Sequence, residues 1–155
     1  MISYPQHGEY PNYAIKYIQL IAKERDVLDI MDMSKNEMLL LLASLQEKIR
    51  IEQHAEGKWT VKEILQHMID TERIFSYRAL RFARYDDTEL PGYDETEYVN
   101  KSFANVRPLQ EMVHEFRLVR ESSIALFKSF DIKVYDNTSL ANGYTMSVRA
   151  IAYII

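Results

Sequence analysis

The sequence predicts an all-α protein, an antiparallel four-helix bundle preceded by a short N-terminal helix. Only 4 Gly and 4 Pro occur in 155 residues, about 5 % where soluble proteins average about 12 %. These residues cluster at a few junctions, and between the junctions apolar residues recur at helical spacing. Turn-rich β-sheet folds need Gly and Pro at their corners, so that class is disfavoured. The length fits one domain over residues 1–155.

The first strong helical pattern begins at Ser34. Ser34 and Glu37 have the spacing of a capping box, which is typical of a helix start. Leu39 and Leu40 lie off the main apolar stripe and predict a second apolar surface that faces a neighbour or a partner chain. A weaker helix is expected over residues 13–28. The stripe itself consists of Met38, Leu41, Leu42, Leu45 and Ile49.

The second helix is predicted from a capping box at Thr60 and Glu63 to about Tyr85. An acidic segment follows over residues 86–97. It lacks the alternating oxygen ligands and the central Gly of a calcium-binding loop, which indicates a solvated loop. The third helix is expected to begin at Pro108, because proline suits the first helical position.

The last helix is predicted to begin near Thr145. It ends on Tyr-Ile-Ile, with none of the Gly, Asn or basic residues that usually end a helix. We therefore expect the natural chain to continue beyond Ile155.

Composition limits the function. The net charge of −4 disfavours nucleic-acid binding, which needs a concentrated basic surface. The absence of cysteine excludes disulfides and thiolate metal sites, so nitrogen and oxygen must hold any metal. No secretory signal pattern and no apolar run of about 20 residues occur. We expect a cytoplasmic protein with neither a nucleic-acid nor a membrane partner.

The second helix carries the candidate functional residues. His67 lies at the margin of the apolar face and is either an edge histidine bonded to a neighbour or a metal ligand or general base. Spacing alone favours the edge histidine, because residues 1–155 contain no His-x-x-x-His pair. Asp70 points away from the stripe, whereas Glu72 lies within it and must be paired or neutral. An ion pair with Arg120 or Arg149 is expected, and orienting a metal ligand is the alternative.

Aromatic side chains lie near these residues in the sequence. Trp59 is predicted to be a hydrophobic staple or core anchor of the second helix. Three tyrosines either line a pocket or lie at the edge of the core; they are Tyr77, Tyr93 and Tyr98. The remaining histidines are weaker candidates, and these are His7, His54 and His114.

Five segments together resemble the DinB/YfiT-like superfamily. They are GKWTVKEI at residues 57–64, HMIDTER at 67–73, YRALR at 77–81, LPGYD at 90–94 and SVRAIAYII at 147–155. The likeness covers the chain from about residue 34 onward, and the order of the segments makes it more specific than any one of them.

The resemblance implies a four-helix bundle, commonly a homodimer, with a divalent metal (zinc or nickel) held by three histidines. His67 occupies the position of the first ligand. The other two form a His-x-x-x-His pair that is expected beyond Ile155, so the metal would be absent or incompletely bound within residues 1–155. With the resemblance, His67 is favoured as a ligand. The candidates for supporting it or lining the pocket are Asp70, Glu72, Arg78 and Arg149.

The resemblance also implies a metal-dependent enzyme that acts on a small molecule. The expected reaction is transfer of a low-molecular-weight thiol (an S-transferase) or hydrolysis. The alternative is a non-catalytic helical bundle that serves as a binding or dimerisation module. That alternative predicts no metal and an interface that uses Leu39 and Leu40.

Overall fold

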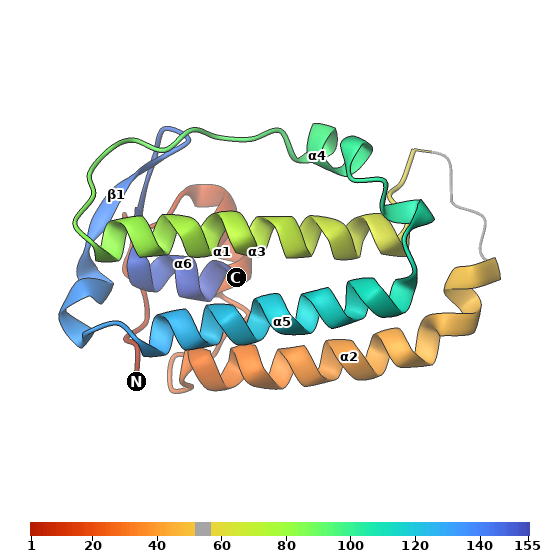
Figure 1. Ribbon diagram of the computed structural model, residues 1–155. Coiled ribbons are helices and arrows are strands. Elements are labelled where there is room, and N and C mark those ends of the chain that lie inside the picture. Colours follow the sequence, from red (N-terminus) through yellow and green to blue (C-terminus); the bar gives the residue numbers. More distant parts are fainter. Residues whose placement is uncertain (52–56) are drawn as a thin grey trace.

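The computed structural model describes residues 1–51 and 57–155, without the side chains of residues 46–51. The predicted helical bundle is confirmed. Its four helices, α2, α3, α5 and α6, lie side by side (Figure 1) and span Val27–Ile51, Val61–Ala83, Leu109–Lys128 and Val148–Ile154. The short N-terminal helix is also present, as the 3₁₀ turn η1 (Asn12–Ala14) and α1 (Ile15–Ile18). It is much shorter than the helix predicted over residues 13–28.

One pair of helices departs from the predicted antiparallel order. Thr60, before α3, has its Oγ1 2.8 Å from Oδ1 of Asn105, which precedes α5. Further along, the hydroxyls of Ser76 and Ser123 lie 2.9 Å apart. These contacts show that α3 and α5 run in the same direction (Figure 1). The connection between them is therefore long and returns along α3 over the length of the bundle.

The predicted start of the first long helix at Ser34 is wrong. The helix α2 begins at Val27, where Asp26 Oδ1 accepts a hydrogen bond from the Leu28 amide (3.0 Å). The hydroxyl of Ser34 lies inside the helix and donates to the Met31 carbonyl (3.1 Å). A Ser-x-x-Glu sequence also fits a helix interior, where serine bonds back to the preceding turn. The sequence signal was therefore ambiguous.

The buried face of α2 differs in part from the predicted stripe. Met31 and Leu42 are buried, whereas Leu41, expected to face inward, is 51 % exposed. Leu40 is 73 % exposed and Leu39 packs against the core. The helix starts earlier than predicted, and its inward-facing positions include residues that precede Ser34. The side chain of Ile49 and the whole of His54 lie outside the described residues.

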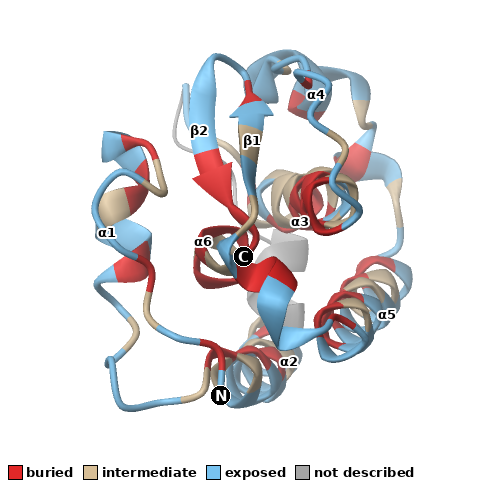
Figure 2. Cartoon of the chain, turned by 90° about the vertical axis from the view of Figure 1, so that its left-hand side faces the viewer, coloured by how far each residue is buried: buried red, intermediate tan, exposed pale blue. Residues whose placement is uncertain are grey.

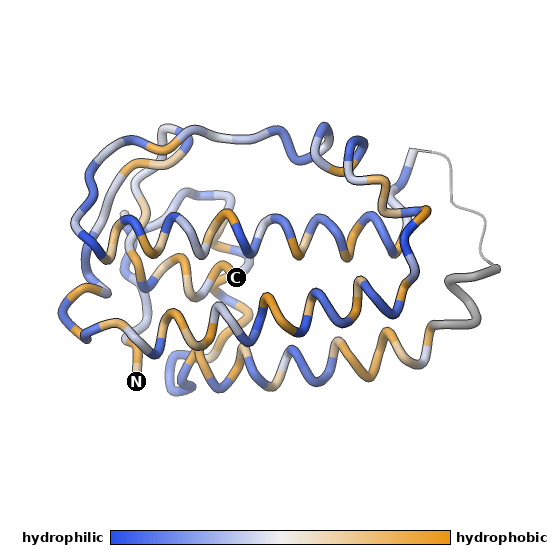
Figure 3. The backbone as a smooth tube through the Cα atoms, in the orientation of Figure 1, coloured by the Kyte–Doolittle hydropathy of each residue, from blue (hydrophilic) through white to orange (hydrophobic). Residues whose placement is uncertain are grey.

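The two central helices begin where the sequence predicted. Thr60 and Glu63 form the complete capping box of α3, with bonds of 2.9 and 2.8 Å in the two directions. Pro108 directly precedes α5 and serves as its N-cap residue. Apolar residues recur along each helix (Figure 3) and form two buried clusters. One joins α2, α3 and α5, and the other joins α6, the N-terminal segment and the hairpin described next.

A β-hairpin precedes α6 and was not predicted. Its strands, β1 (Thr138–Ala141) and β2 (Tyr144–Ser147), pair antiparallel around Asn142 and Gly143, which both have positive φ. The last helix therefore begins at Val148 rather than near Thr145. Ser147 caps it by accepting a bond from the Ala150 amide (3.0 Å). The hairpin covers one end of the bundle beside α3 and α6 (Figure 2).

The acidic segment is ordered by its own contacts. Asp86 forms an ion pair with Arg81, and Asp94 caps the short helix α4 (Glu95–Lys101). The amide of Leu90 donates to the Leu140 carbonyl (3.0 Å), which ties the segment to β1. A Cβ atom at Gly92 would overlap the carboxamide of Asn142, so a larger residue there would displace that side chain. The turns η2 (Ala104–Val106) and η3 (Ile132–Asp136) complete the connections.

Within the part of the chain that the structure describes, no helix combines the length and the apolar character needed to cross a bilayer.

Candidate functional site

One face of α3 carries His67, Thr71 and Arg78. Their spacing of four and seven residues places them within about 40° of one another around the helix axis. The segment that connects α3 to α5 runs along α3 (Figure 1) and brings Tyr93 against this face. The row of polar side chains is thus covered by a loop instead of by another bundle helix.

His67 is held between an aromatic ring and a hydroxyl group. The Trp59 ring lies 5.1 Å from the His67 ring, centroid to centroid, with the two planes tilted by 48°. On the other side, Thr71 Oγ1 lies 3.5 Å from His67 Nδ1 and 2.8 Å from the Tyr93 hydroxyl. Trp59 therefore contacts His67, a role that the predicted core anchor did not include.

The contact with Thr71 distinguishes the two ring nitrogens of His67. It engages Nδ1, and in the described residues no hydrogen bond engages Nε2. Metal-binding histidines usually coordinate through one nitrogen while a hydrogen-bonding group orients the other. His67 shares one feature with such histidines: its Nδ1 lies 3.5 Å from the Thr71 hydroxyl, which in turn lies 2.8 Å from the Tyr93 hydroxyl. The sequence signal for Thr71 was its position four residues after His67.

A complete set of metal ligands is not present in the described residues. No group of three His, Cys, Asp or Glu side chains among residues 1–51 and 57–155 is placed to hold an ion. His67 fits one imidazole ligand, and any further ligands would have to come from outside this part of the chain.

Glu72 forms the ion pair that the sequence predicted, with Arg120 of α5. Glu72 is 3 % and Arg120 is 5 % exposed, and Glu72 Oε2 accepts bonds from Arg120 Nε (3.0 Å) and Nη2 (2.9 Å). Burial raises the pKa of Glu72, and the Arg120 charge opposes that rise. Glu72 lies about 140° around α3 from His67. It therefore stabilises the core and does not reach the His67 ring.

Asp70 lies about 60° around α3 from His67 and contacts residues of its own helix. Its Oδ1 accepts a hydrogen bond from Gln66 Nε2 (2.9 Å) and lies 3.9 Å from Arg73 Nη1. Partial burial raises the pKa of Asp70. No contact joins Asp70 to His67 in the described residues. Asp70 therefore belongs to a polar cluster with Gln66 and Arg73 that does not include His67.

Arg149, at the start of α6, forms ion pairs with carboxylates that are not part of the His67 surroundings. It forms ion pairs with Glu9 and with Asp136 (2.7 Å), and Ser147 also donates to Glu9 (3.0 Å). These contacts fasten the N-terminal segment to the start of α6. Of the two partners expected for Glu72, the structure shows Arg120, and Arg149 pairs with other carboxylates.

Of the three tyrosines proposed as pocket residues, Tyr93 lies at the candidate site. Its ring packs against Tyr98 at 5.1 Å between centroids, and Tyr98 is 48 % exposed. Tyr77 lies on another face of α3, where its hydroxyl accepts a bond from Arg81 Nη1 (2.5 Å). The LPGYD segment thus contributes to the site through Tyr93.

A comparison with known families identifies the group to which this sequence belongs. The profile of the DinB superfamily matches residues 30–155. The chain belongs to the DinB superfamily. A similar solved structure is that of YfiT from Bacillus subtilis, at 13 % sequence identity and a TM-score of 0.65. The match covers 98 % of this DinB-superfamily chain and 84 % of YfiT.

YfiT is described as a probable metal-dependent hydrolase with an unusual four-helix bundle topology. At this identity the likeness shows the fold of the present DinB-superfamily member and nothing further. No curated protein matches the chain by sequence.

Proposed function

We propose that this DinB-superfamily protein is a metal-dependent enzyme that acts on a small molecule, with His67 as one metal ligand. The observation that carries the proposal is the environment of His67. Its Nδ1 faces a hydroxyl that Tyr93 fixes, and its Nε2 is not engaged by the described residues. The description of YfiT as a probable metal-dependent hydrolase, on the same fold, supports it.

The remaining ligands of the proposed site are the two histidines that the family resemblance predicts outside residues 1–155. A divalent ion held by three imidazoles and open at a fourth position activates bound water or another nucleophile. We propose hydrolysis, or transfer of a low-molecular-weight thiol, as the reaction. Zinc and nickel are the proposed metals, because both accept imidazole ligands.

The residues around His67 have positioning roles in this proposal. Trp59 and Thr71 both contact the imidazole, one through its ring and the other through its hydroxyl. Tyr93 fixes the Thr71 hydroxyl and belongs to the segment that covers α3. Together they hold His67 in one orientation before any ion binds, which reduces the entropy lost on binding.

The proposal is tested by metal titration of the natural protein. After removal of bound metal with a chelator, addition of Zn²⁺ or Ni²⁺ should saturate at about one ion per chain, as isothermal titration calorimetry measures. The melting temperature should rise with the metal concentration, because a ligand of the folded state stabilises it. Calcium is the control, because it prefers oxygen ligands. Absence of saturable Zn²⁺ and Ni²⁺ binding would contradict the proposal.

A dimerisation role is favoured by one observation on α2. Leu40 is 73 % and Leu41 is 51 % exposed, and they are adjacent on the outer side of the helix. We propose that this surface contributes to a homodimer. Leu40→Lys should convert the dimer to a monomer in light scattering, because a buried unpaired charge is costly at an interface. Leu20→Lys, at another exposed leucine (82 %), is the control. A Leu40→Lys protein that stays dimeric would exclude this interface.

A further inference from the structure

Arg78 of α3 is a buried cation that has no carboxylate partner among the described residues. It is 3 % exposed, and its guanidinium lies over the Phe75 ring, 5.0 Å from the centroid. Its one hydrogen bond within this part of the chain runs from Nη2 to the Pro91 carbonyl (3.1 Å). A guanidinium has five N–H donors, so most of its capacity is unused.

This arrangement differs from that of the other arginines on the inner side of the fold. Arg120 and Arg149 both face carboxylates. Burial lowers the pKa of Arg78, yet an arginine stays charged in proteins. Burying an unpaired charge costs free energy. Among the described residues, Glu72 Oε1 is the only fully enclosed side-chain polar atom that lacks a hydrogen bond. The unengaged nitrogens of Arg78 are therefore not sealed off and can donate to an anion or to water.

Two phenols act on the Arg78 charge. Burial lowers the pKa of Arg78, Tyr13 and Tyr93 oppose that change, and no acidic side chain of the described residues is among its causes. Tyr93 also lies two residues after Pro91, whose carbonyl accepts the Arg78 hydrogen bond. Tyr13 comes from η1 and Tyr93 from the segment that covers α3, so two separate parts of the chain converge on Arg78. Phenolic hydroxyls donate hydrogen bonds to oxyanions, and an arginine adds two parallel bonds and the opposite charge.

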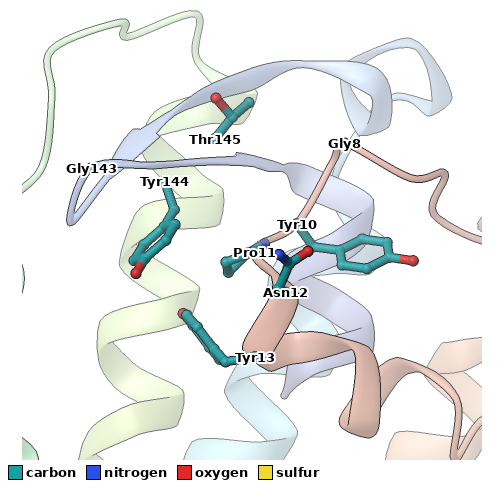
Figure 4. A pocket seen from close by; sticks show the side chains of 8 residues that line it. All are labelled: Gly8, Tyr10, Pro11, Asn12, Tyr13, Gly143, Tyr144 and Thr145. Atoms are coloured by element: carbon teal, nitrogen blue, oxygen red, sulfur yellow. The ribbon is translucent and has the colours of Figure 1, made fainter.

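A cleft next to Tyr13 provides space for a ligand. Its volume is about 410 Å³, and its lining includes Tyr10, Tyr13 and Tyr144. The rings of Tyr13 and Tyr144 meet edge to face, with 5.7 Å between centroids. Figure 4 shows their two hydroxyls pointing toward α3, while the hydroxyl of Tyr10 points away from it. Tyr13 lines this cleft and is 46 % exposed, whereas Arg78 is not among the residues that line it.

We propose that Arg78, with the hydroxyls of Tyr13 and Tyr93, binds the oxyanion group of a small-molecule ligand, a carboxylate or a phosphate. Arg78 and His67 lie on the same face of α3, about 16 Å apart along the helix axis. In the proposed enzyme the acidic end of the substrate would lie at Arg78 and its reacting part near His67. This placement of the substrate between Arg78 and His67 rests on the proposed function, whereas the binding of an anion at Arg78 does not.

The experiment measures anion binding without metal or turnover. The melting temperature of the metal-free natural protein is followed against inorganic phosphate and, separately, succinate, at constant ionic strength set with chloride. A saturable rise is expected with the anion that the site accepts. Comparing the two anions distinguishes a phosphate from a carboxylate ligand. Arg78→Met should weaken the apparent affinity at least tenfold, because hydrogen bonds to a charged group contribute about 1.5–3 kcal/mol.

Three further variants complete the test. Arg84→Met, at an exposed arginine just after α3, should keep the wild-type anion response. Tyr13→Phe should weaken it, because the ring stays and the hydroxyl is lost. His67→Ala should keep the response while losing metal, which separates this inference from the proposed function. A wild-type protein that responds to neither anion, or an Arg78→Met protein that responds like the wild type, would overturn the inference.

The stability of Arg78→Met without anion is a second, independent readout. If the site is built for an anion, removing the unpaired charge leaves the melting temperature unchanged or raises it. If Arg78 only anchors the Pro91 carbonyl, the same substitution lowers the melting temperature, and the wild-type protein shows no saturable response to either anion. That result would also overturn the inference.

Discussion

Replacement of Arg120 by alanine is expected to destabilise the protein by about 3–5 kcal/mol, the cost of breaking a buried ion pair from one side. Arg120 contacts Glu72 through the Oε2 atom alone, and no hydrogen bond from the described residues reaches Glu72 Oε1. Without Arg120 the buried carboxylate would have no compensating charge. Arg120 also donates to the Ile155 carbonyl (3.1 Å), so α6 would lose a tether. Urea denaturation at neutral pH measures the loss.

The destabilisation should depend on pH in a defined direction. Burial raises the pKa of Glu72 in the folded state, so the folded protein takes up this proton more readily than the unfolded one. Loss of the Arg120 charge raises that pKa further. The difference between variant and wild type should therefore be largest at neutral pH. It should shrink as the pH falls toward about 4.3, the pKa of glutamate in the unfolded chain.

Two controls make the Arg120 prediction specific. Arg117→Ala removes an exposed arginine of the same helix and should change stability by less than about 0.5 kcal/mol. The double variant Glu72→Leu with Arg120→Met should recover most of the loss, because apolar residues can replace a buried ion pair. An Arg120→Ala protein as stable as the wild type would show that the pair has no structural role.

The second large effect is expected for His67→Ala. Loss of one of three imidazole ligands should weaken metal binding by more than about 100-fold, since removing a group that only orients a ligand already costs roughly 10–100-fold. Thr71→Val removes the hydroxyl that faces His67 Nδ1 and should fall within that smaller range. Equal losses for the two variants would contradict the ligand role of His67. Titration of metal-free protein with Zn²⁺ gives the affinities.

The helices with strong local signals could be predicted from the sequence. Thr60 and Glu63 form a reciprocal capping box, and Pro108 directly precedes a helix; both signals act within one turn. Ser34 shows the limit of such signals, because Ser-x-x-Glu also fits a helix interior. The hairpin over residues 138–147 was missed because each of its strands has only four residues, which is too short for a clear alternating pattern. The apolar spacing from Val148 onward also does not mark exactly where the following helix begins.

The site could be predicted only in part. The pairing of Glu72 with one of two candidate arginines followed from residue type and helical position, and the structure shows that the partner is Arg120. The interpretation of His67 as a metal ligand came from the family resemblance, because spacing alone favoured an edge histidine. The position of Trp59 against His67 could not be predicted, because it depends on how the chain enters α3. The approach of Tyr13 and Tyr93 to Arg78 joins segments far apart in the sequence. Contacts of that kind depend on the course of the loops, which no periodic pattern encodes.

The most direct test of the metal-dependent function is the metal content of three proteins purified side by side: the natural protein, His67→Ala and His114→Ala. His114 is the control because it is an exposed histidine on α5, 3.1 Å from Arg117 through Nδ1. Inductively coupled plasma mass spectrometry should find about one divalent ion per chain in the natural protein and in His114→Ala, and almost none in His67→Ala. A folded His67→Ala protein with undiminished metal would contradict the account.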